Sequence, residues 1–218
     1  MKKNLKNFCL ILVKMRKVCY DKYNGSRGEK KEKNMKKVTL LGDSIRLIGY
    51  GTVVPQMLGE EYEVFQPDDN CRFAKYTLRM LFELREQIAG SDIIHWNNGL
   101  WDISTRLFDD GLAFTSEEEY VTNMLRIATQ LKKLGKRIIF ATTTPCHPEN
   151  EYNDNEVIAR YNAIIVPKLQ EMGIEINDLN AVVSKDILKY IREDDKIHLT
   201  DEGIAVCAEQ VVKAIKGE

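Results

Sequence analysis

The sequence lacks any long hydrophobic segment. Near the N-terminus the longest apolar run covers residues 8–13, which is far too short to cross a bilayer. That run is also a poor secretion signal, because Lys14 interrupts the apolar pattern and no small-residue cleavage site follows. The protein is therefore expected to have no membrane span and to be cytoplasmic.

Cysteine and histidine are both scarce. The five cysteines are odd in number and do not have the spacing of metal ligands. Reduced thiols are expected, with neither a disulfide framework nor a metal site. Only three histidines are present, His95, His147 and His198. Few side chains of the type best suited to general base catalysis near neutral pH are therefore available.

An excess of charge of one sign is also missing, since the formal net charge is −1. The balance hides an asymmetry, because residues 1–37 hold 13 Lys and Arg against 3 acidic residues, about +10 (13 − 3), which leaves about −11 for the rest. A basic arm can bind nucleic acid or an anionic membrane. We expect residues 1–34 to be a disordered leader or an upstream mis-start, with Met35 as the natural start and no nucleic-acid partner. A functional basic arm is the alternative.

From residue 35 onward, short apolar runs alternate with long helical patterns, which predicts one domain over residues 35–218. The apolar runs predict five strands, at residues 38–41, 62–65, 92–96, 137–141 and 174–176. Helices are predicted near residues 48–58, 73–88, 117–134, 155–172, 179–192 and 200–216, with Ser116 and Thr200 as N-caps. This alternation implies a parallel sheet in a three-layer α/β/α sandwich of the flavodoxin-like type.

Polar residues follow the predicted strands, at the edge where parallel sheets collect ligands. After the first strand, the stretch VTLLGDSIRLIGYG breaks off into Gly-Asp-Ser. Ser44 at this break is either a helix N-cap or a nucleophile above the sheet edge. The later strands are followed by QPDDNCRFAKYT, NNGLWDIS and TTTPCHPEN, and DDKIHLTDEG lies near the C-terminus. Together these segments predict a site on one rim.

Of the three histidines, His198 fits a general base best. His95 lies inside the strand DIIHW, where a packed core position is expected, and His147 lies in a loop between two prolines. Asp195 precedes His198 by three residues. Across a tight turn its carboxylate can reach the imidazole Nδ1 and leave Nε2 for a serine. A loop histidine beside a solvated acid is the alternative.

At its two ends the sequence resembles the SGNH/GDSL hydrolases, a family of esterases and acylhydrolases with a flavodoxin-like sheet. The resemblance rests on GDSIR and DDKIHLTDEG, in that order at the ends of an α/β pattern, and covers about residues 37–216. It implies that Ser44 is the nucleophile, that His198 acts as general base and then acid, and that Asp195 orients the histidine. It implies no metal and no organic cofactor.

Two middle motifs depart from the family's pattern. The second normally centres on a glycine whose backbone N–H points at the oxyanion, but here it reads NCR. The third is usually Gly-x-Asn-Asp, but here it reads GLWD. A backbone donor needs no glycine, so the resemblance still implies an oxyanion hole made by the Ser44 and Cys71 amides. The side-chain donor is predicted to be Asn97, with Asn98 as the alternate.

The expected activity is hydrolysis of short-chain esters, such as acetyl groups on a small molecule or a carbohydrate. No long lid insertion is recognised, so a shallow pocket is expected. Candidate substrate contacts are Asn70, Arg72, Trp101 and His147. A thioesterase or a lysophospholipase would use the same triad, and the altered motifs leave a non-catalytic binding module as a further alternative. The oligomeric state is left open.

Overall fold

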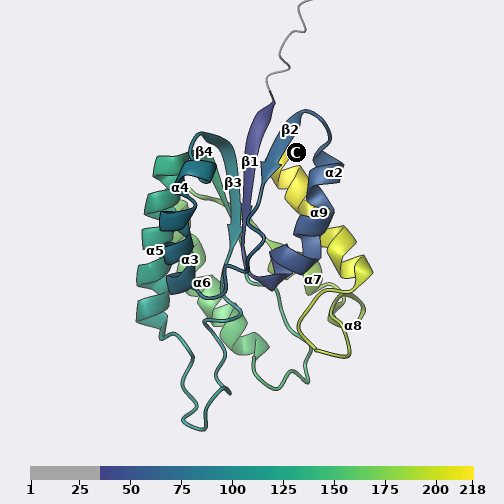
Figure 1. The fold of residues 1–218 in the computed structure, drawn as a ribbon. Helices are drawn as coiled ribbons and strands as arrows, with labels where there is room; N and C mark the ends of the chain where they lie inside the picture. Colours follow the sequence, from purple (N-terminus) through teal and green to yellow (C-terminus); the bar gives the residue numbers. More distant parts are fainter. Residues whose placement is uncertain (1–34) are drawn as a thin grey trace, which may run out of the picture. The chain divides into compact units, whose positions relative to one another are not determined.

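The structure, a computed structural model, describes residues 35–218, and the predicted leader at residues 1–34 lies outside the described residues. One five-stranded sheet has the order β2-β1-β3-β4-β5, and all of its neighbouring strands are parallel. Its strands are β1 (Lys36–Leu41), β2 (Tyr62–Phe65), β3 (Ser91–Asn97), β4 (Gly135–Ala141) and β5 (Glu175–Asn177). This strand order is the flavodoxin-like one, which confirms the predicted fold class (Figure 1).

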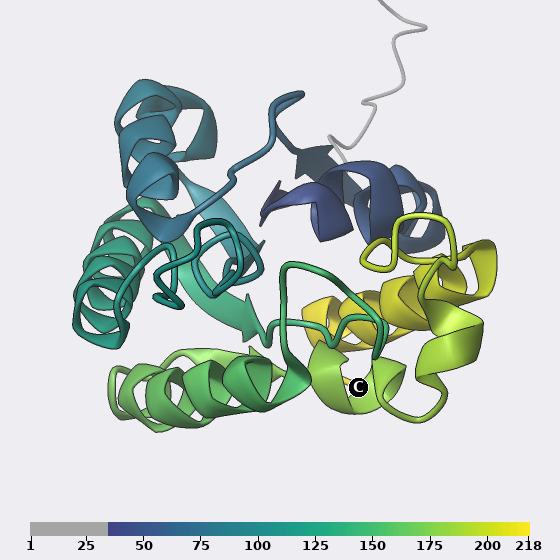
Figure 2. The same ribbon diagram turned by 90° about the horizontal axis from the view of Figure 1, so that it is seen from below.

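Helices cover both faces of the sheet (Figures 1 and 2). On one face α5 (Glu117–Leu134) packs against both α3 (Ala74–Glu83) and α6 (Asn155–Glu171). On the other face α9 (Asp201–Lys216) packs against the remaining helices of that layer. Those are η2 (Tyr50–Thr52), α2 (Val54–Leu58), α7 (Leu179–Val183) and α8 (Ile187–Tyr190). Among residues 35–218, no helix combines the length and the apolar character that crossing a membrane requires.

The central strands are apolar because both of their faces are covered. Leu40, Ile94 and Phe140, from β1, β3 and β4, are completely buried, as expected for a parallel sheet between two helical layers. The predicted N-caps are confirmed, since the Ser116 hydroxyl accepts the Glu119 N–H of α5 and the Thr200 hydroxyl caps α9. Because all five strands are parallel, their carboxyl ends lie at one edge of the sheet.

Three predicted helices are interrupted. The helix expected near residues 48–58 is instead a π-helical turn η1 (Ile45–Gly49), then η2 and α2, because Gly49 leaves the helical region with φ −107° and ψ −123°. The helix expected over residues 73–88 stops at Leu84, which separates α3 from α4 (Arg85–Ile88). The last, near residues 179–192, divides into α7 and α8, because the Asp186 side chain caps a new helix.

Candidate active site

Ser44 lies just beyond the carboxyl end of β1, on a tight turn. The Asp43 carboxylate accepts the Ile45 N–H at 2.9 Å, and the Asp43 carbonyl accepts the Arg46 N–H at 3.1 Å. Ser44 precedes η1, but its hydroxyl makes no capping hydrogen bond. The ordinary structural role of a serine at a helix start is therefore not used here.

His198 lies in a short hairpin that leads into α9. The Arg192 N–H donates to the His198 carbonyl at 2.8 Å, and Ile191 pairs with Leu199 in an antiparallel bridge. Inside the hairpin, the Asp195 Oδ1 accepts the His198 N–H at 2.9 Å, and Asp195 Oδ2 lies 2.9 Å from the His198 Nδ1. One carboxylate therefore fixes both the backbone and the ring of the histidine.

The Asp195 carboxylate is held in its ionised form. Burial alone would raise the pKa of Asp195, but hydrogen bonds from the His198 backbone, the His198 ring and the Ile197 backbone lower that pKa below its ordinary value. Arg192 Nε also lies 3.5 Å from the same carboxylate. An ionised carboxylate at Nδ1 stabilises an imidazolium, which forms when Nε2 takes up a proton.

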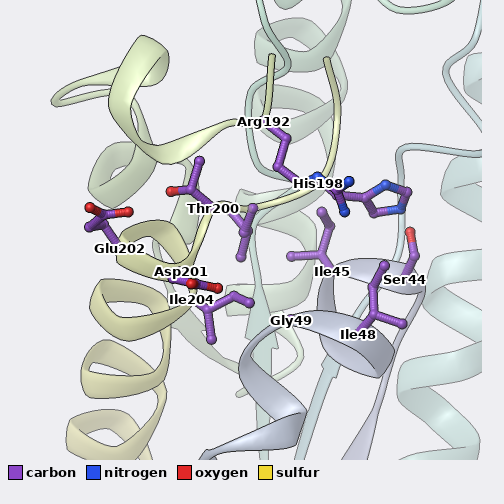
Figure 3. Close-up of a pocket in the computed structure, with 11 residues that line it drawn as sticks. Ser44, Ile45, Ile48, Gly49, Arg192, His198, Thr200, Asp201, Glu202 and Ile204 are labelled. Atoms are coloured by element: carbon purple, nitrogen blue, oxygen red, sulfur yellow. The ribbon is translucent and has the colours of Figure 1, made fainter. Parts of the chain in front are cut away.

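Ser44 and His198 line the same cavity, although 154 positions (198 − 44) separate them in the sequence. Figure 3 shows the Ser44 hydroxyl directed at the His198 ring, as a nucleophile and its base require. The cavity has a volume of about 500 Å³, within the range of small-molecule sites. It lies between η1 and the start of α9, and its other lining residues are Ile45, Ile48, Gly49, Arg192, Leu199, Thr200, Asp201, Glu202 and Ile204.

Asn97, the predicted oxyanion donor, belongs to a buried chain of hydrogen bonds beneath the turn that carries Ser44. Its Nδ2 donates to Asp43 Oδ1 at 2.8 Å, and the Tyr50 hydroxyl donates to its Oδ1 at 2.7 Å. The Tyr50 oxygen lies 3.5 Å from His95 Nδ1, and Asn177 Nδ2 lies 3.1 Å from His95 Nε2. The chain thus runs from β5 through the sheet to the turn.

Burial affects the pKa of both ionisable groups discussed in this chain, His95 and Asp43. Desolvation lowers the pKa of His95 to about 3, so the ring is neutral, and its buried position on β3 is the one predicted. A neutral ring accepts from Asn177 and donates to Tyr50, so every donor points toward Asp43. Burial raises the pKa of Asp43, and hydrogen bonds from Asn97 and from the Ile45 backbone partly offset that rise.

Because Gly42 has no side chain, the Asn97 side chain can lie directly beneath the turn that carries Ser44. A Cβ at Gly42 would lie 2.0 Å from Asn97 Oδ1, so a larger residue would displace the asparagine. Gly42 also joins the turn to the second motif, since its carbonyl accepts the Cys71 N–H at 3.0 Å and its N–H donates to Cys71 Sγ at 3.3 Å. The Cys71 N–H therefore already has a partner, which an oxyanion would have to share or replace, whereas the Asn97 amide has a second N–H besides the one donated to Asp43.

The alternate donor, Asn98, ties β3 to α3. Its Nδ2 donates to the Arg72 carbonyl at 2.9 Å, and its Oδ1 accepts the Thr77 hydroxyl at 3.0 Å. Nearby, both oxygens of Asp102 accept the Ala74 N–H, at 3.0 and 3.2 Å. The third motif thus anchors the first turn of α3 and holds the second motif beside it.

Asn70 and Arg72 shape the loop that follows β2. Arg72 adopts a left-handed backbone with φ +49°, in the loop where the resemblance leads one to expect a glycine. Asn70 Oδ1 accepts the Arg72 N–H at 2.7 Å, and the guanidinium stacks 4.7 Å from the centre of the Tyr76 ring. Both residues, predicted as substrate contacts, lie outside the lining of the Ser44 cavity.

The other two predicted contacts also lie outside that lining. His147 is 5% exposed and braces the base hairpin: its N–H donates to the Lys196 carbonyl at 3.0 Å, and its Nε2 lies 3.1 Å from Glu193 Oε2. Trp101 is 44% exposed in the long connection from β3 to α5. His147 therefore positions the hairpin, whereas Trp101 remains accessible at the rim.

Arg46 is the residue of this site that the sequence analysis missed. Its side chain is completely buried, and its guanidinium donates to the carbonyls of Pro67 and Asp69, each at 2.7 Å, and to that of Gly42 at 3.2 Å. Arg46 thereby holds the loop between β2 and α3 against the turn that carries Ser44. The available signal was an arginine inside the apolar stretch that follows Ser44.

No family model matches the chain. In sequence it is 29% identical to the GDSL esterase/lipase WDL1 of Oryza sativa subsp. japonica over 113 residues. The aligned segment is 45% of this chain and 44% of that protein, so the chain spans less than half the length of this curated relative.

Several solved structures share the fold at low sequence identity. A lipase/acylhydrolase from Enterococcus faecalis has a TM-score of 0.68 and 18% identity over 84% of this chain and 96% of that chain. An acetylxylan esterase from Geobacillus stearothermophilus has a TM-score of 0.67 and 18% identity over 85% and 97%. A GDSL-like lipase from Bacteroides thetaiotaomicron has a TM-score of 0.61 and 15% identity over 92% and 97%. The chain therefore has the fold of the GDSL-like lipases and acetylxylan esterases, and it is related in sequence to a GDSL esterase/lipase.

Proposed function

We propose that this protein is a serine carboxylic ester hydrolase whose triad is Ser44, His198 and Asp195. The observation that carries the proposal is the arrangement around the imidazole. The Ser44 hydroxyl faces the ring in a shared cavity, while Asp195 Oδ2 lies 2.9 Å from Nδ1 on the other side. The relationship to a GDSL esterase/lipase supports the same chemistry. The reaction needs no metal and no organic cofactor.

Catalysis proceeds in two half-reactions. The Ser44 oxygen attacks the ester carbonyl while His198 Nε2 takes its proton, and the ionised Asp195 stabilises the resulting imidazolium. The tetrahedral intermediate collapses, the bond to the alcohol oxygen breaks, and His198 returns the proton to the leaving alcohol. Water then attacks the acyl-enzyme through the same proton transfers, which releases the carboxylic acid and restores Ser44.

The oxyanion is proposed to bind to the Ser44 and Cys71 amides and to the Asn97 side chain. The present partners of the last two are the Gly42 carbonyl and the Asp43 carboxylate. A negatively charged oxygen is a stronger acceptor than a carbonyl, so it can draw the Cys71 N–H away from Gly42. The Asn97 amide carries a second N–H besides the one that it donates to Asp43. A side-chain donor of this kind typically changes the rate by about 10²–10³.

The proposed substrates are short-chain esters, with acetyl groups on a small molecule or a carbohydrate as the leading class. Two structures with the same fold are described as acetylxylan esterases. The exposed Trp101 ring at the rim supports a sugar partner, because flat aromatic faces offer apolar surface for stacking. A thioester or a lysophospholipid would use the same triad and require different pocket walls.

The proposal is tested by hydrolysis of 4-nitrophenyl acetate and of a panel of acetylated sugars. Ser44→Ala should lower kcat by about 10⁶, because the nucleophile is lost, and should leave only the residual rate that the oxyanion hole and substrate binding provide. Ser184→Ala is the matched control, since that serine is exposed after α7, and it should retain full activity. Unchanged turnover in Ser44→Ala would exclude this serine as the nucleophile. Wild-type protein that is inert toward acetyl, butyryl and thioester substrates would favour a binding module instead.

A further inference from the structure

A second cavity adjoins the one that holds Ser44 and His198. It has a volume of about 410 Å³ and lies between α9 and the segment formed by η2 and α2. Asp201 and Ile204 line both cavities. Figure 3 shows the Ile204 side chain pointing from α9 toward the η1 turn near Gly49. The Ile204 side chain therefore forms part of a wall between the two cavities.

The second cavity is apolar along its length and acidic at its ends. Val53 and Met57 face Ile204 and Ala205 across it, and Met57 is 40% exposed. The lining positions of α9 run from residue 201 to residue 209, which is about 12 Å of helix axis. Exposed apolar surface of this kind gains free energy when an apolar chain covers it.

We propose that the second cavity binds an apolar chain on the alcohol side of the ester, and that Ile204 controls how far this chain extends. The inference rests on the proposed ester hydrolysis. His198 must protonate the leaving alcohol, so the alcohol oxygen lies on the side of its ring. The residues directly after His198, from Leu199 to Asp201, line the first cavity, and Asp201 continues into the second.

Charge limits the kind of alcohol that fits. Carboxylates at Asp201 and Glu209 line the second cavity, and Glu202 adds a third in the lining of the first. These groups repel an anionic alcohol, whereas a neutral alkyl chain between them covers Val53, Met57 and Ala205 without meeting a like charge. Among the short-chain esters proposed above, the second cavity therefore favours those of a neutral, extended, apolar alcohol over acetylated sugars.

The experiment uses two matched series of soluble esters. In the first, the acid is always acetic and the alcohol is ethanol, butanol, hexanol or octanol; in the second, the alcohol is always ethanol and the acid is lengthened in the same steps. We expect kcat/KM in the alcohol series to increase by up to about fourfold per buried methylene, equivalent to about 0.8 kcal/mol. The acid series should stay flat or fall.

Three variants locate the effect. Ala205→Trp fills the second cavity from an exposed position and should abolish the increase beyond the butyl ester. Ile204→Ala widens the junction and should extend the increase to the longest alcohol. Lys213→Trp is the matched control, because it places the same ring at an exposed site on α9 outside both cavities, and it should keep the wild-type slope.

The outcomes separate this inference from the proposed function. A flat alcohol series with active enzyme overturns the inference and leaves ester hydrolysis intact. An increase confined to the acid series also overturns it, because the apolar chain would then be the acyl group. An increase that Ala205→Trp and Lys213→Trp reduce equally excludes the second cavity as its origin. If Ser44→Ala hydrolyses every ester as well as wild type does, the proposed function fails and this inference falls with it.

Discussion

The turn that carries Ser44 and the hairpin that carries His198 are both short, but they are held in opposite ways. Asp43, Arg46 and Asn97, which fix the turn, are at most 5% exposed. The charged side chains around the hairpin are mostly in solvent, with Arg192 at 42% and Asp194 at 65% exposure. Buried polar groups are costly to leave unpaired, whereas exposed ion pairs contribute little. Ser44 is thus positioned by the protein interior, and His198 mainly by its own hairpin.

The largest expected effect is on the hairpin, where Asp195 is the member of the proposed triad that orients His198. Asp195→Asn should lower kcat by about 10³–10⁴, because the imidazolium loses its counter-charge and the ring its correct tautomer. Asp194→Asn is the control, since Asp194 is exposed and pairs with Arg192, and it should change kcat by no more than a few-fold. If steady-state assays show that kcat falls equally in the two variants, Asp195 has no special role beside His198.

The next effect is on the turn. Arg46→Met keeps much of the side-chain volume but removes the donor of the three carbonyls that the guanidinium binds. We expect the free energy of unfolding to fall by about 3 kcal/mol or more, because buried carbonyls are left without partners. Urea titration followed by circular dichroism measures it. A loss below about 1 kcal/mol would show that water replaces the guanidinium and that the interior does not fix the turn.

A smaller effect depends on pH. Because the pKa of buried His95 is lowered to about 3, the unfolded chain, in which a histidine titrates near 6.5, binds the proton first as the pH falls. Stability should therefore decrease as the pH falls from about 6.5 toward 3, by about 1 kcal/mol between pH 6.5 and 5.5. His95→Asn should lack this decrease.

This pH dependence is measured from the urea midpoints of wild type and His95→Asn at pH 6.5 and pH 5.5. Burial raises the pKa of Asp102 to about 7, which gives the opposite slope, with stability lost as the pH rises from about 4 toward 7. Asp102 is present in both proteins, so its contribution cancels when their pH dependences are subtracted. Identical pH dependences would mean that the ring is already charged or is solvated.

The smallest effect is expected for Arg192→Met, the counterpart of Arg46→Met on the exposed side. Arg192 pairs with Asp194 and lies 3.5 Å from Asp195, but such pairs are worth about 0–1 kcal/mol. The same urea titration should therefore show a change below about 1 kcal/mol. If the two arginine variants lose equal stability, burial does not distinguish the two halves of the site.

The fold was predictable because burial leaves a direct pattern in the sequence. Strands covered on both faces appear as short apolar runs, and β2 begins and ends where the pattern predicted. The N-caps Ser116 and Thr200 were recognisable because a hydroxyl at a helix start satisfies a local N–H. Asp195 beside His198 is similarly local, since three positions separate them.

The braces of the turn were not predictable because their partners are distant in the sequence. Asn97 donates to Asp43 across 54 positions, a contact that the prediction of an oxyanion donor did not include. Arg46 lies in the apolar stretch that follows Ser44. Nothing in that stretch indicates that its guanidinium binds carbonyls of the loop at residues 67–69. Gly49 interrupts the helix through its backbone angles, and a Cβ at Gly51 would lie 2.5 Å from the Arg46 carbonyl oxygen. A pattern of apolar residues records neither feature.

The distance along the chain between the two halves of the site has a consequence for biosynthesis. At about 5–20 residues per second, the ribosome needs roughly 8–31 s to travel the 154 positions (198 − 44) from Ser44 to His198. Throughout that interval the nascent protein carries Ser44 without His198, so under the proposed mechanism it cannot hydrolyse esters. The proposed activity arises only after the hairpin at residues 191–199 has emerged and closed. The time at which ester hydrolysis first appears in a translation reaction would therefore report when this hairpin folds.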